Sequence, residues 1–291
     1  MTRDLFADIA GIRLKNPIVA ASGTYSYAES SLYYDAAALG CITTKSVSPG
    51  PWIGNDAPVI AETYGGMLNA IGLANSGLAV YTAPGGELAL LKAAGATVCA
   101  NVVGRTAEDY AEVCAGLADS AVDLLELNIS CPNVKCGGMS FGTAPKVAAA
   151  LVRECKKVAG AKPLLVKLTP NVTDITEIAL AVLDAGADGL TLINTLKGMR
   201  IDLKTKKPVL STGIGGLSGP AIHPVAVRMV WETRQAVGDA VPIIGMGGVM
   251  TGADAYELML AGANAVAVGT AALIDPCAPV RILKELEAYL K

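Results

Sequence analysis

The sequence predicts an α/β fold, a single (β/α)8 TIM barrel, from three observations. Eight short apolar runs alternate with helical stretches along the 291 residues. Hydrophobic residues make up 52% of the chain, which is enough for a large core, and Gly 32 with Pro 15 suit many short connections. Near-continuous apolar strands between amphipathic helices are typical of a parallel sheet covered on both faces. Eight such units favour a closed barrel, and a doubly wound open sheet is the alternative.

The expected strands are short runs bounded by turn-forming residues. In chain order they span 17–22, 41–46, 97–102, 124–130, 164–170, 189–195, 242–248 and 265–270. A small N-terminal hairpin is expected before the first of them. The chain contains no linker or low-complexity segment, so we expect residues 1–291 to form one domain.

Amphipathic stretches rich in Ala and Leu occupy the intervals between the strands. Helices are expected over 107–119, 144–160, 174–186, 221–238, 252–262 and 278–291. Two connections are much longer, 47–96 and 196–220. Long loops that follow barrel strands lie over the C-terminal face, where active sites are built, so the site is expected there.

Charge and cysteine content exclude several classes of protein. A net charge of −3 speaks against a nucleic-acid or polybasic membrane surface, and a single His excludes a His-rich metal site. The seven cysteines are odd in number and irregularly spaced, so we expect most of them to be buried small side chains rather than disulfides. Cys131 and Cys136 lack the third Cys of the plant-type iron–sulfur pattern. No metal is expected.

Targeting signals are not recognised in the sequence. The N-terminus carries Arg3, Asp4 and Asp8 and no apolar signal-peptide core. The uncharged apolar stretch 258–274 is shorter than a membrane span and contains Gly262. We therefore expect a cytoplasmic protein.

Polar residues gather at the carboxyl ends of the expected strands. They are Ser22, Lys45, Ser46, Asn101, Asn128, Lys167, Asn194 and Thr195. Strand ends near solvent often carry polar residues, which is the alternative interpretation for any one of them. The strand beginnings show no matching run of Lys and Asn, however. Two lysines on one barrel face predict a ligand that carries or develops negative charge.

Glycine clusters occupy 213–219, 245–248 and 268–270. Loops after strands seven and eight of a barrel often bind phosphate through backbone N–H groups at a helix N-terminus. Ordinary turns also use Gly, which is the alternative here. Flavin mononucleotide (FMN) would supply both a phosphate for the glycine loops and an anionic ring system for the lysines.

The most distinctive motif, 128–138, follows the fourth strand. Cys131, fixed by Pro132 and followed by Gly137 and Gly138, is a candidate catalytic thiol on a lid; a half-buried structural cysteine is the alternative. No partner His lies near it in the sequence, because His223 is expected to be a surface residue at a helix start. A Cys–His hydrolase pair is therefore not expected, and a Cys that acts as a proton base remains.

These motifs together resemble the dihydroorotate dehydrogenases over nearly the whole chain. The matching segments are PIVAASGTY, TTKSVSP, NAIGLANSG, ELNISCPNVKCGG, LLVKLTPN, LINTLKGMRID, GGLSGPAI, IIGMGGV and AVAVGTA. NTLKGMRID and the Cys in ISCPN are similar to the NAD-linked class 1B catalytic subunit. The fumarate-linked class 1A also uses Cys and remains an alternative. Cys136, next to Gly137, departs from the family pattern.

Two other groups fit less well. Class 2 enzymes carry a membrane-associating N-terminal segment and a Ser base, and neither is recognised here. Dihydropyrimidine dehydrogenase contains a similar barrel within a much longer chain that has its own iron–sulfur motifs. A non-redox phosphate-binding barrel is the alternative from another functional class.

The resemblance implies an FMN-binding barrel that oxidises dihydroorotate to orotate in pyrimidine biosynthesis, with Cys131 as the base. FMN contacts are implied for Ser22, Lys45, Ser46, Asn101, Asn128, Lys167, Ile193, Gly219, Gly247, Gly248, Gly269 and Thr270. Substrate contacts are implied for Lys45, Asn69, Ala70, Ile71, Gly72, Leu73, Asn128, Asn133, Asn194 and Thr195.

The resemblance also implies a partner. The chain shows no G-x-G-x-x-G after its first strand and no cluster ligands, so NAD+ is expected to be reduced elsewhere. An electron-transfer subunit with FAD and a 2Fe-2S cluster is implied, on a homodimer core of a heterotetramer.

Overall fold

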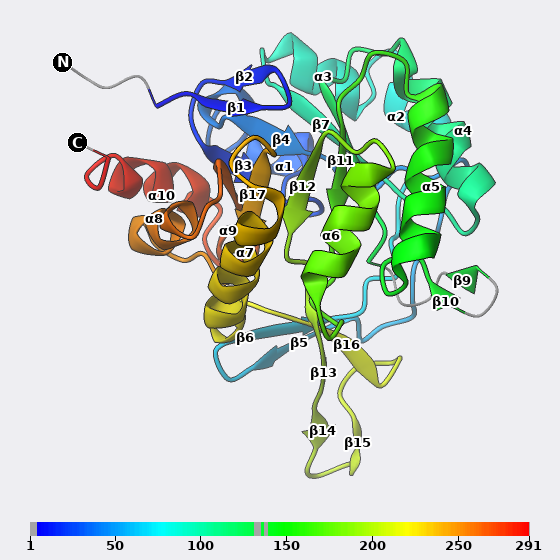
Figure 1. The fold of residues 1–291 in the computed structure, drawn as a ribbon. Coiled ribbons are helices and arrows are strands. Elements are labelled where there is room, and N and C mark those ends of the chain that lie inside the picture. The colour runs from blue at the N-terminus through cyan, green and yellow to red at the C-terminus, as the bar shows by residue number, and fades with distance from the viewer. Residues whose placement is uncertain (1–4, 131–134, 137–138, 291) are drawn as a thin grey trace.

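The computed structural model describes residues 5–130, 135–136 and 139–290. Eight parallel strands close into a barrel in the order β11-β12-β17-β18-β3-β4-β7-β8 (Figure 1). Their bounds are β3 Ile18–Ala20, β4 Cys41–Thr43, β7 Val98–Val102, β8 Leu124–Asn128, β11 Leu164–Lys167, β12 Gly189–Leu192, β17 Ile243–Met246 and β18 Ala265–Val268. Every expected strand is present. The open-sheet alternative is wrong because β18 pairs with β3 and closes the ring.

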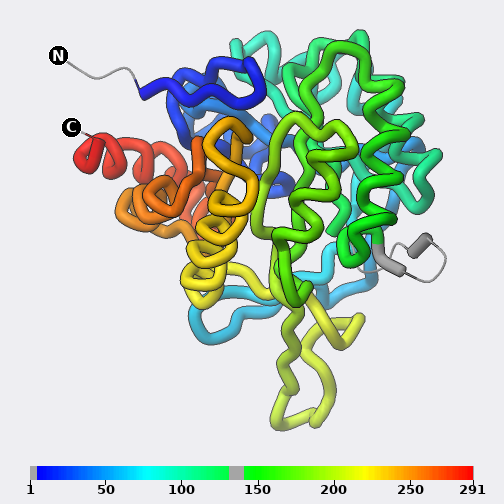
Figure 2. Tube along the Cα trace, viewed as in Figure 1, coloured from blue at the N-terminus to red at the C-terminus, as the bar shows by residue number. Residues whose placement is uncertain are grey.

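Helices surround the barrel, as the trace in Figure 2 also shows. The six expected helices are α4 Ala107–Ala118, α5 Pro145–Val158, α6 Ile175–Asp184, α7 His223–Val237, α8 Gly252–Leu260 and α10 Ala278–Leu286. Shorter helices are α1 Tyr27–Ser30, α2 Leu78–Thr82, α3 Glu87–Ala93 and α9 Thr270–Ile274. Capping boxes at Thr106 and Thr251 explain why α4 and α8 begin where they do. Of the helices in the described part of the chain, none is long and apolar enough to cross a membrane.

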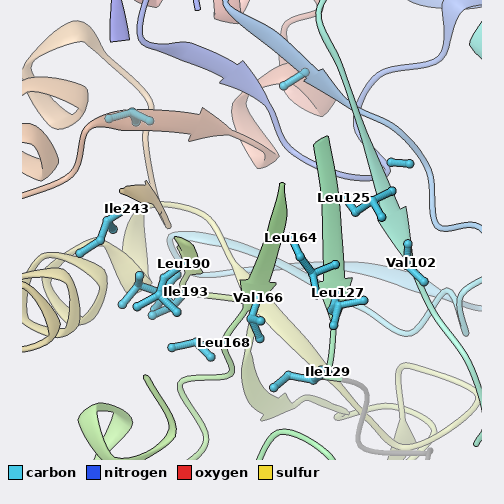
Figure 3. Close-up of a cluster of buried hydrophobic side chains, with 14 of the residues drawn as sticks. Val102, Leu125, Leu127, Ile129, Leu164, Val166, Leu168, Leu190, Ile193 and Ile243 are labelled. Atoms are coloured by element: carbon cyan, nitrogen blue, oxygen red, sulfur yellow. The ribbon is translucent and has the colours of Figure 1, made fainter. Parts of the chain in front are cut away.

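The side chains of each strand alternate between two cores. Leu125, Leu127, Leu164, Val166 and Leu190 belong to the larger core between the barrel and its helices (Figure 3). The residues between them point into the barrel, because successive side chains on a strand face opposite sides. Outward side chains of the strands therefore pack against the helices, and inward side chains are the ones that can form a binding site.

The barrel interior is apolar at one end and polar at the other. The hairpin of β1 (Ala7–Ile9) and β2 (Ile12–Leu14) places Ile9 and Leu14 against Leu124 and Leu165 near the strand beginnings. Further along the strands the inward positions carry polar groups, including Asn101 and Glu126. The expected hairpin is therefore present and seals the end opposite the site.

The two long connections meet over the C-terminal face. The strands β5 Ile60–Thr63, β6 Gly66–Asn69, β13 Leu196–Met199 and β16 Ile214–Ser218 form a four-stranded antiparallel sheet in the order β13-β16-β6-β5. The short strands β14 (Ile201–Asp202) and β15 (Lys207–Pro208) continue it as a projecting arm (Figure 1). The barrel mouth is thus partly covered by a sheet drawn from two distant segments.

Most of the described cysteines are buried small side chains, as expected. Cys41, Cys99, Cys114 and Cys155 are buried, whereas Cys277 is exposed. Burial raises the pKa of the Cys99 thiol well above its ordinary value. Cys99 therefore packs as a small apolar side chain.

One expectation is wrong. His223 begins α7 as predicted, but it is not a surface residue, because only 12% of its side chain is exposed. Nδ1 lies 2.8 Å from the carbonyl oxygen of Gly247, and Nε2 lies 3.2 Å from a Glu257 carboxylate oxygen. The residues that cover His223 follow β17 or lie on α8, so the local sequence could not reveal them.

Candidate active site

A cavity of about 840 Å³ lies at the carboxyl ends of the barrel strands. Its volume falls within the range of roughly 300–1,000 Å³ that is common for ligand pockets. Most of the predicted ligand residues line it: Ser22, Lys45, Ser46, Asn69, Ala70, Ile71, Gly72, Leu73, Asn128, Lys167, Ile193, Asn194, Thr195, Gly219, Gly247, Gly248, Gly269 and Thr270. Residues from strand ends and from the loop sheet thus share one cavity.

One predicted residue does not line the cavity, and two others lie outside the described residues. Asn101 is fully buried and is not among the residues that line the cavity. Cys131 and Asn133 lie outside the described residues, as do Gly137 and Gly138, and their roles stay predictions. Ser130 is the last described residue before Cys131, and its hydroxyl donates to the Lys167 carbonyl at 2.9 Å.

A buried polar network lies under the cavity. The hydroxyl of Ser46 donates to Asn101 Oδ1 at 2.7 Å, and Asn101 Nδ2 donates to Glu126 Oε1 at 2.7 Å. Asn128 Nδ2 also donates to Asn101 Oδ1, at 3.5 Å, and Asn194 Nδ2 donates to Asn128 Oδ1 at 3.4 Å. Buried polar groups persist only when they are paired, so this network fixes side chains on four strands or strand ends.

The two lysines at the cavity differ in their surroundings. Lys167 is 6% exposed, and its Nζ lies 3.7 Å from Glu126 Oε1. Lys45 forms no ion pair with any described acid, and burial lowers the pKa of its ammonium group from 10.5. Gly23 has φ +79° and lies next to Lys45, because a Cβ at this glycine would be in ordinary van der Waals contact with Lys45 Nζ, at 3.5 Å. Lys45 is thus a cation that still lacks a counter-charge within the described chain.

The glycines after β17 allow a close approach of backbone segments. Gly247 has φ +132° and Gly248 has φ +70°, conformations that L side chains rarely adopt. A Cβ on Gly248 would lie 2.8 Å from the Gly219 carbonyl oxygen. The N–H groups of Gly248 and Gly269 donate to no other described residue, so both are available to an anion. The hydroxyl of Thr270 donates to the Ser218 hydroxyl at 2.8 Å and joins the last strand end to β16.

Two functional candidates were not predicted. Glu126 holds both Lys167 and Asn101, and its only sequence signal is its inward position two residues before Asn128 in an apolar strand. Asn171 also lines the cavity, donates to Thr169 Oγ1 at 2.9 Å and to the Thr195 carbonyl at 3.0 Å, and so fixes the entry to β13. Nothing in the local sequence distinguishes Asn171 from an ordinary loop asparagine.

Comparison with known proteins identifies the family. The sequence model of dihydroorotate dehydrogenase matches residues 4–290. Proteins named dihydroorotate dehydrogenase B (NAD(+)), catalytic subunit, are similar over almost their whole length. The one from Alkaliphilus metalliredigens is 52% identical over 98% of this chain and 93% of its own, and the one from Listeria monocytogenes is 54% identical over 97% and 92%. Alkaliphilus oremlandii has one that is 51% identical over 99% of this chain and 94% of its own. The chain belongs to the dihydroorotate dehydrogenase family.

Proposed function

We propose that this chain oxidises dihydroorotate to orotate in pyrimidine biosynthesis, with FMN as its cofactor and NAD+ as the final electron acceptor. The observation that carries the proposal is the cavity itself. It combines the lysines Lys45 and Lys167, the amides Asn69, Asn128 and Asn194, and the glycine loops after β17 and β18. The relatives at 51–54% identity are named for this activity.

The residues present fit FMN. A phosphate needs several N–H donors without competing acceptors; Gly248 offers one beside the start of α7, and Gly269 offers one at the N-cap of α9. The ring system needs a cation to stabilise negative charge, and Lys167 lies in the cavity wall with Glu126 behind it. FMN bound there would accept the hydride that leaves C6 of dihydroorotate.

The chain's own residues would then bind the substrate and move its proton. Lys45 offers an unpaired ammonium to the substrate carboxylate. Asn69, Asn128, Asn133 and Asn194 carry amides that both donate and accept, which suits the edge of a cyclic amide. Cys131 would take the proton from C5 as a thiolate, and the segment from 131 to 142 would admit the substrate.

The electron acceptor follows from the names of the relatives. They are called NAD(+)-linked catalytic subunits, which supports a partner subunit that reduces NAD+. We propose that the partner carries FAD and a 2Fe-2S cluster and binds a homodimer of this chain as a heterotetramer. Direct transfer from FMN to NAD+ would need a nicotinamide pocket where orotate is proposed to bind.

The test is the acceptor preference of the purified chain. We expect it to contain flavin and to reduce an artificial dye with dihydroorotate, releasing orotate, while NAD+ is reduced only after the partner is added. A colourless protein that cannot be loaded with FMN would contradict the proposal. Fumarate reduction at the rate of dye reduction would move the chain to the fumarate-linked class.

A further inference from the structure

The peptide bond between Gly247 and Gly248 can face the candidate phosphate loop in two ways. It is trans, so its carbonyl oxygen and its N–H point in opposite directions. Both of its neighbours are glycines with positive φ, and a peptide between two glycines can turn over without a clash of Cβ atoms. One orientation offers the cavity an N–H donor. The other offers it a carbonyl oxygen, which repels a phosphate.

His223 contacts this peptide from behind the loop. Gly247 and Gly248 both line the cavity, and His223 does not. Its Nδ1 lies 2.8 Å from the Gly247 carbonyl oxygen, and because a carbonyl only accepts, Nδ1 must carry the hydrogen. Within the described residues, no other group donates to this carbonyl. The side chain of His223 is therefore the one described partner of the Gly247 carbonyl.

The imidazole ring of His223 is anchored at its second nitrogen. Nε2 lies 3.2 Å from a Glu257 carboxylate oxygen and 3.9 Å from an Asp254 carboxylate oxygen, both on α8. A ring turned over about its Cβ–Cγ bond would direct carbon atoms at the carbonyl and at the carboxylates, and would lose both contacts. Since only 12% of the side chain is exposed, little water competes for Nδ1. The donor that faces Gly247 is thus fixed in place.

The fixed donor selects one orientation of the peptide. With the Gly247 carbonyl toward Nδ1, the hydrogen bond forms and the Gly248 N–H points the opposite way, toward the cavity. The reverse orientation would place the Gly248 N–H against the Nδ1 hydrogen, so two donors would meet and neither would be satisfied. The Gly248 N–H donates to no described residue, as expected of a donor that is kept for a ligand.

We infer that His223 is a positioning residue for the phosphate of FMN. Its Nδ1 hydrogen holds the Gly247–Gly248 peptide with the N–H toward the cavity before the cofactor binds, and His223 itself does not touch FMN. The inference rests on the proposed function, because it takes the anion at this loop to be the FMN phosphate. A loop that is already oriented binds more tightly, since no fraction of the protein must first turn its peptide over.

Two substitutions of similar shape separate the hydrogen bond from the ring. His223→Asn keeps an N–H donor at the position of Nδ1, because in both side chains this nitrogen is bonded to Cγ. His223→Leu places a methyl group at the same position. Both variants remove the ring and its contact with Glu257, so the donor to the Gly247 carbonyl is what distinguishes them.

Apoprotein of each variant is titrated with FMN and, separately, with riboflavin, which has the same ring system and no phosphate. We expect His223→Leu to raise the Kd for FMN about fivefold to tenfold, the effect of roughly one lost hydrogen bond, and to leave the Kd for riboflavin within about twofold of wild type. His223→Asn is expected to bind FMN within about twofold of wild type. A general defect in folding would weaken the binding of both flavins in both variants.

Three results would overturn the inference. One is FMN affinity within about twofold of wild type in His223→Leu, and another is an equal loss in His223→Asn and His223→Leu. The third is an equal loss of affinity for FMN and riboflavin, because the phosphate would then play no part. Wild-type protein that binds no FMN would instead refute the proposed function.

A crystal structure of the wild-type protein with FMN does not depend on any variant folding. The inference requires the Gly248 nitrogen to lie within hydrogen-bond distance of a phosphate oxygen while the Gly247 carbonyl stays on His223 Nδ1. A Gly247 carbonyl turned away from His223 in that structure would overturn it.

Discussion

Gly248 and His223 are in contact so close that no side chain fits between them. A Cβ on Gly248 would lie 2.7 Å from His223 Cβ and 2.9 Å from the His223 backbone nitrogen. Gly248 follows β17 and His223 is the first residue of α7, so this contact fixes the start of the helix against the candidate phosphate loop. His223 Nδ1 reinforces it through the carbonyl of Gly247 at 2.8 Å.

Gly248→Ala is therefore expected to weaken FMN binding and to destabilise the protein. The new Cβ would push α7 away from the loop, and overpacking of this kind costs about 1–3 kcal/mol beyond the cost of a positive φ. Gly238→Ala is the control, because Gly238 ends the same helix with φ +75° and has nothing within 4 Å of its Cβ position. Titration of apoprotein with FMN, followed by thermal unfolding, measures both effects. Equal FMN affinity in the two variants would contradict the proposed phosphate site.

Lys45→Met is expected to stabilise the ligand-free protein while it abolishes orotate binding. Burial lowers the pKa of Lys45 from 10.5, so the folded state binds this proton less tightly than the unfolded state does. The charged form therefore costs stability below the folded pKa, and that cost disappears as pH rises from the folded pKa to 10.5. Thermal unfolding at several pH values should show the largest gain at neutral pH.

The control for this prediction is Lys92→Met. Lys92 Nζ lies 2.6 Å from an Asp123 carboxylate oxygen and donates to the Ala96 carbonyl at 3.1 Å, so its loss should lower the melting temperature. A fall in melting temperature in Lys45→Met as well would show that Lys45 has a counter-charge in the free protein.

Lys167→Ala is expected to cost stability and flavin affinity together. It leaves the Glu126 carboxylate buried without its cation, and breaking a buried pair from one side typically costs about 3–5 kcal/mol. Lys156→Ala is the comparison: Lys156 pairs with Asp188, and both side chains are about one third exposed, so its loss should cost only about 1 kcal/mol. Denaturant unfolding and FMN titration give the two values. Unchanged flavin affinity in Lys167→Ala would remove this lysine from the proposed cofactor site.

Cys131→Ser tests the proposed base. A free thiol has a pKa of about 8.5 and a serine hydroxyl ionises far less readily, so the variant should retain FMN and orotate binding but lose most turnover at neutral pH. Part of the turnover should return at high pH. The measurement is the pH profile of dye reduction. Wild-type turnover at neutral pH in the variant would exclude Cys131 as the base.

The sequence predicted the barrel because each strand carries its own local signal. Runs such as LLELN and LLVK are largely apolar and every residue in them is buried, which is typical of a parallel strand covered on both faces. The same local patterns reveal the polar strand ends, because Lys45, Asn128 and Lys167 each come at the end of such a run. Local patterns predict this fold because each strand can be recognised from its own residues. The number of strands, eight, then indicates that the sheet closes into a barrel.

Contacts between distant segments were not predictable in this way. Gly216 pairs with Asn69 across 147 residues, and no local pattern in either segment indicates that their strands meet. The same reason explains why Glu126 was missed and why His223 was wrongly expected at the surface. Both are defined by partners on other strands or helices, which become neighbours only when the barrel closes.

The proposed function requires this chain itself to move a hydride from dihydroorotate to a flavin in the cavity. The most direct test is a single turnover without oxygen, in which dihydroorotate is added to the purified flavin-loaded chain in the absence of any partner or dye. We expect the visible flavin absorbance to be lost and one orotate to form for each flavin. Flavin absorbance that stays unchanged, with no orotate formed, would contradict it.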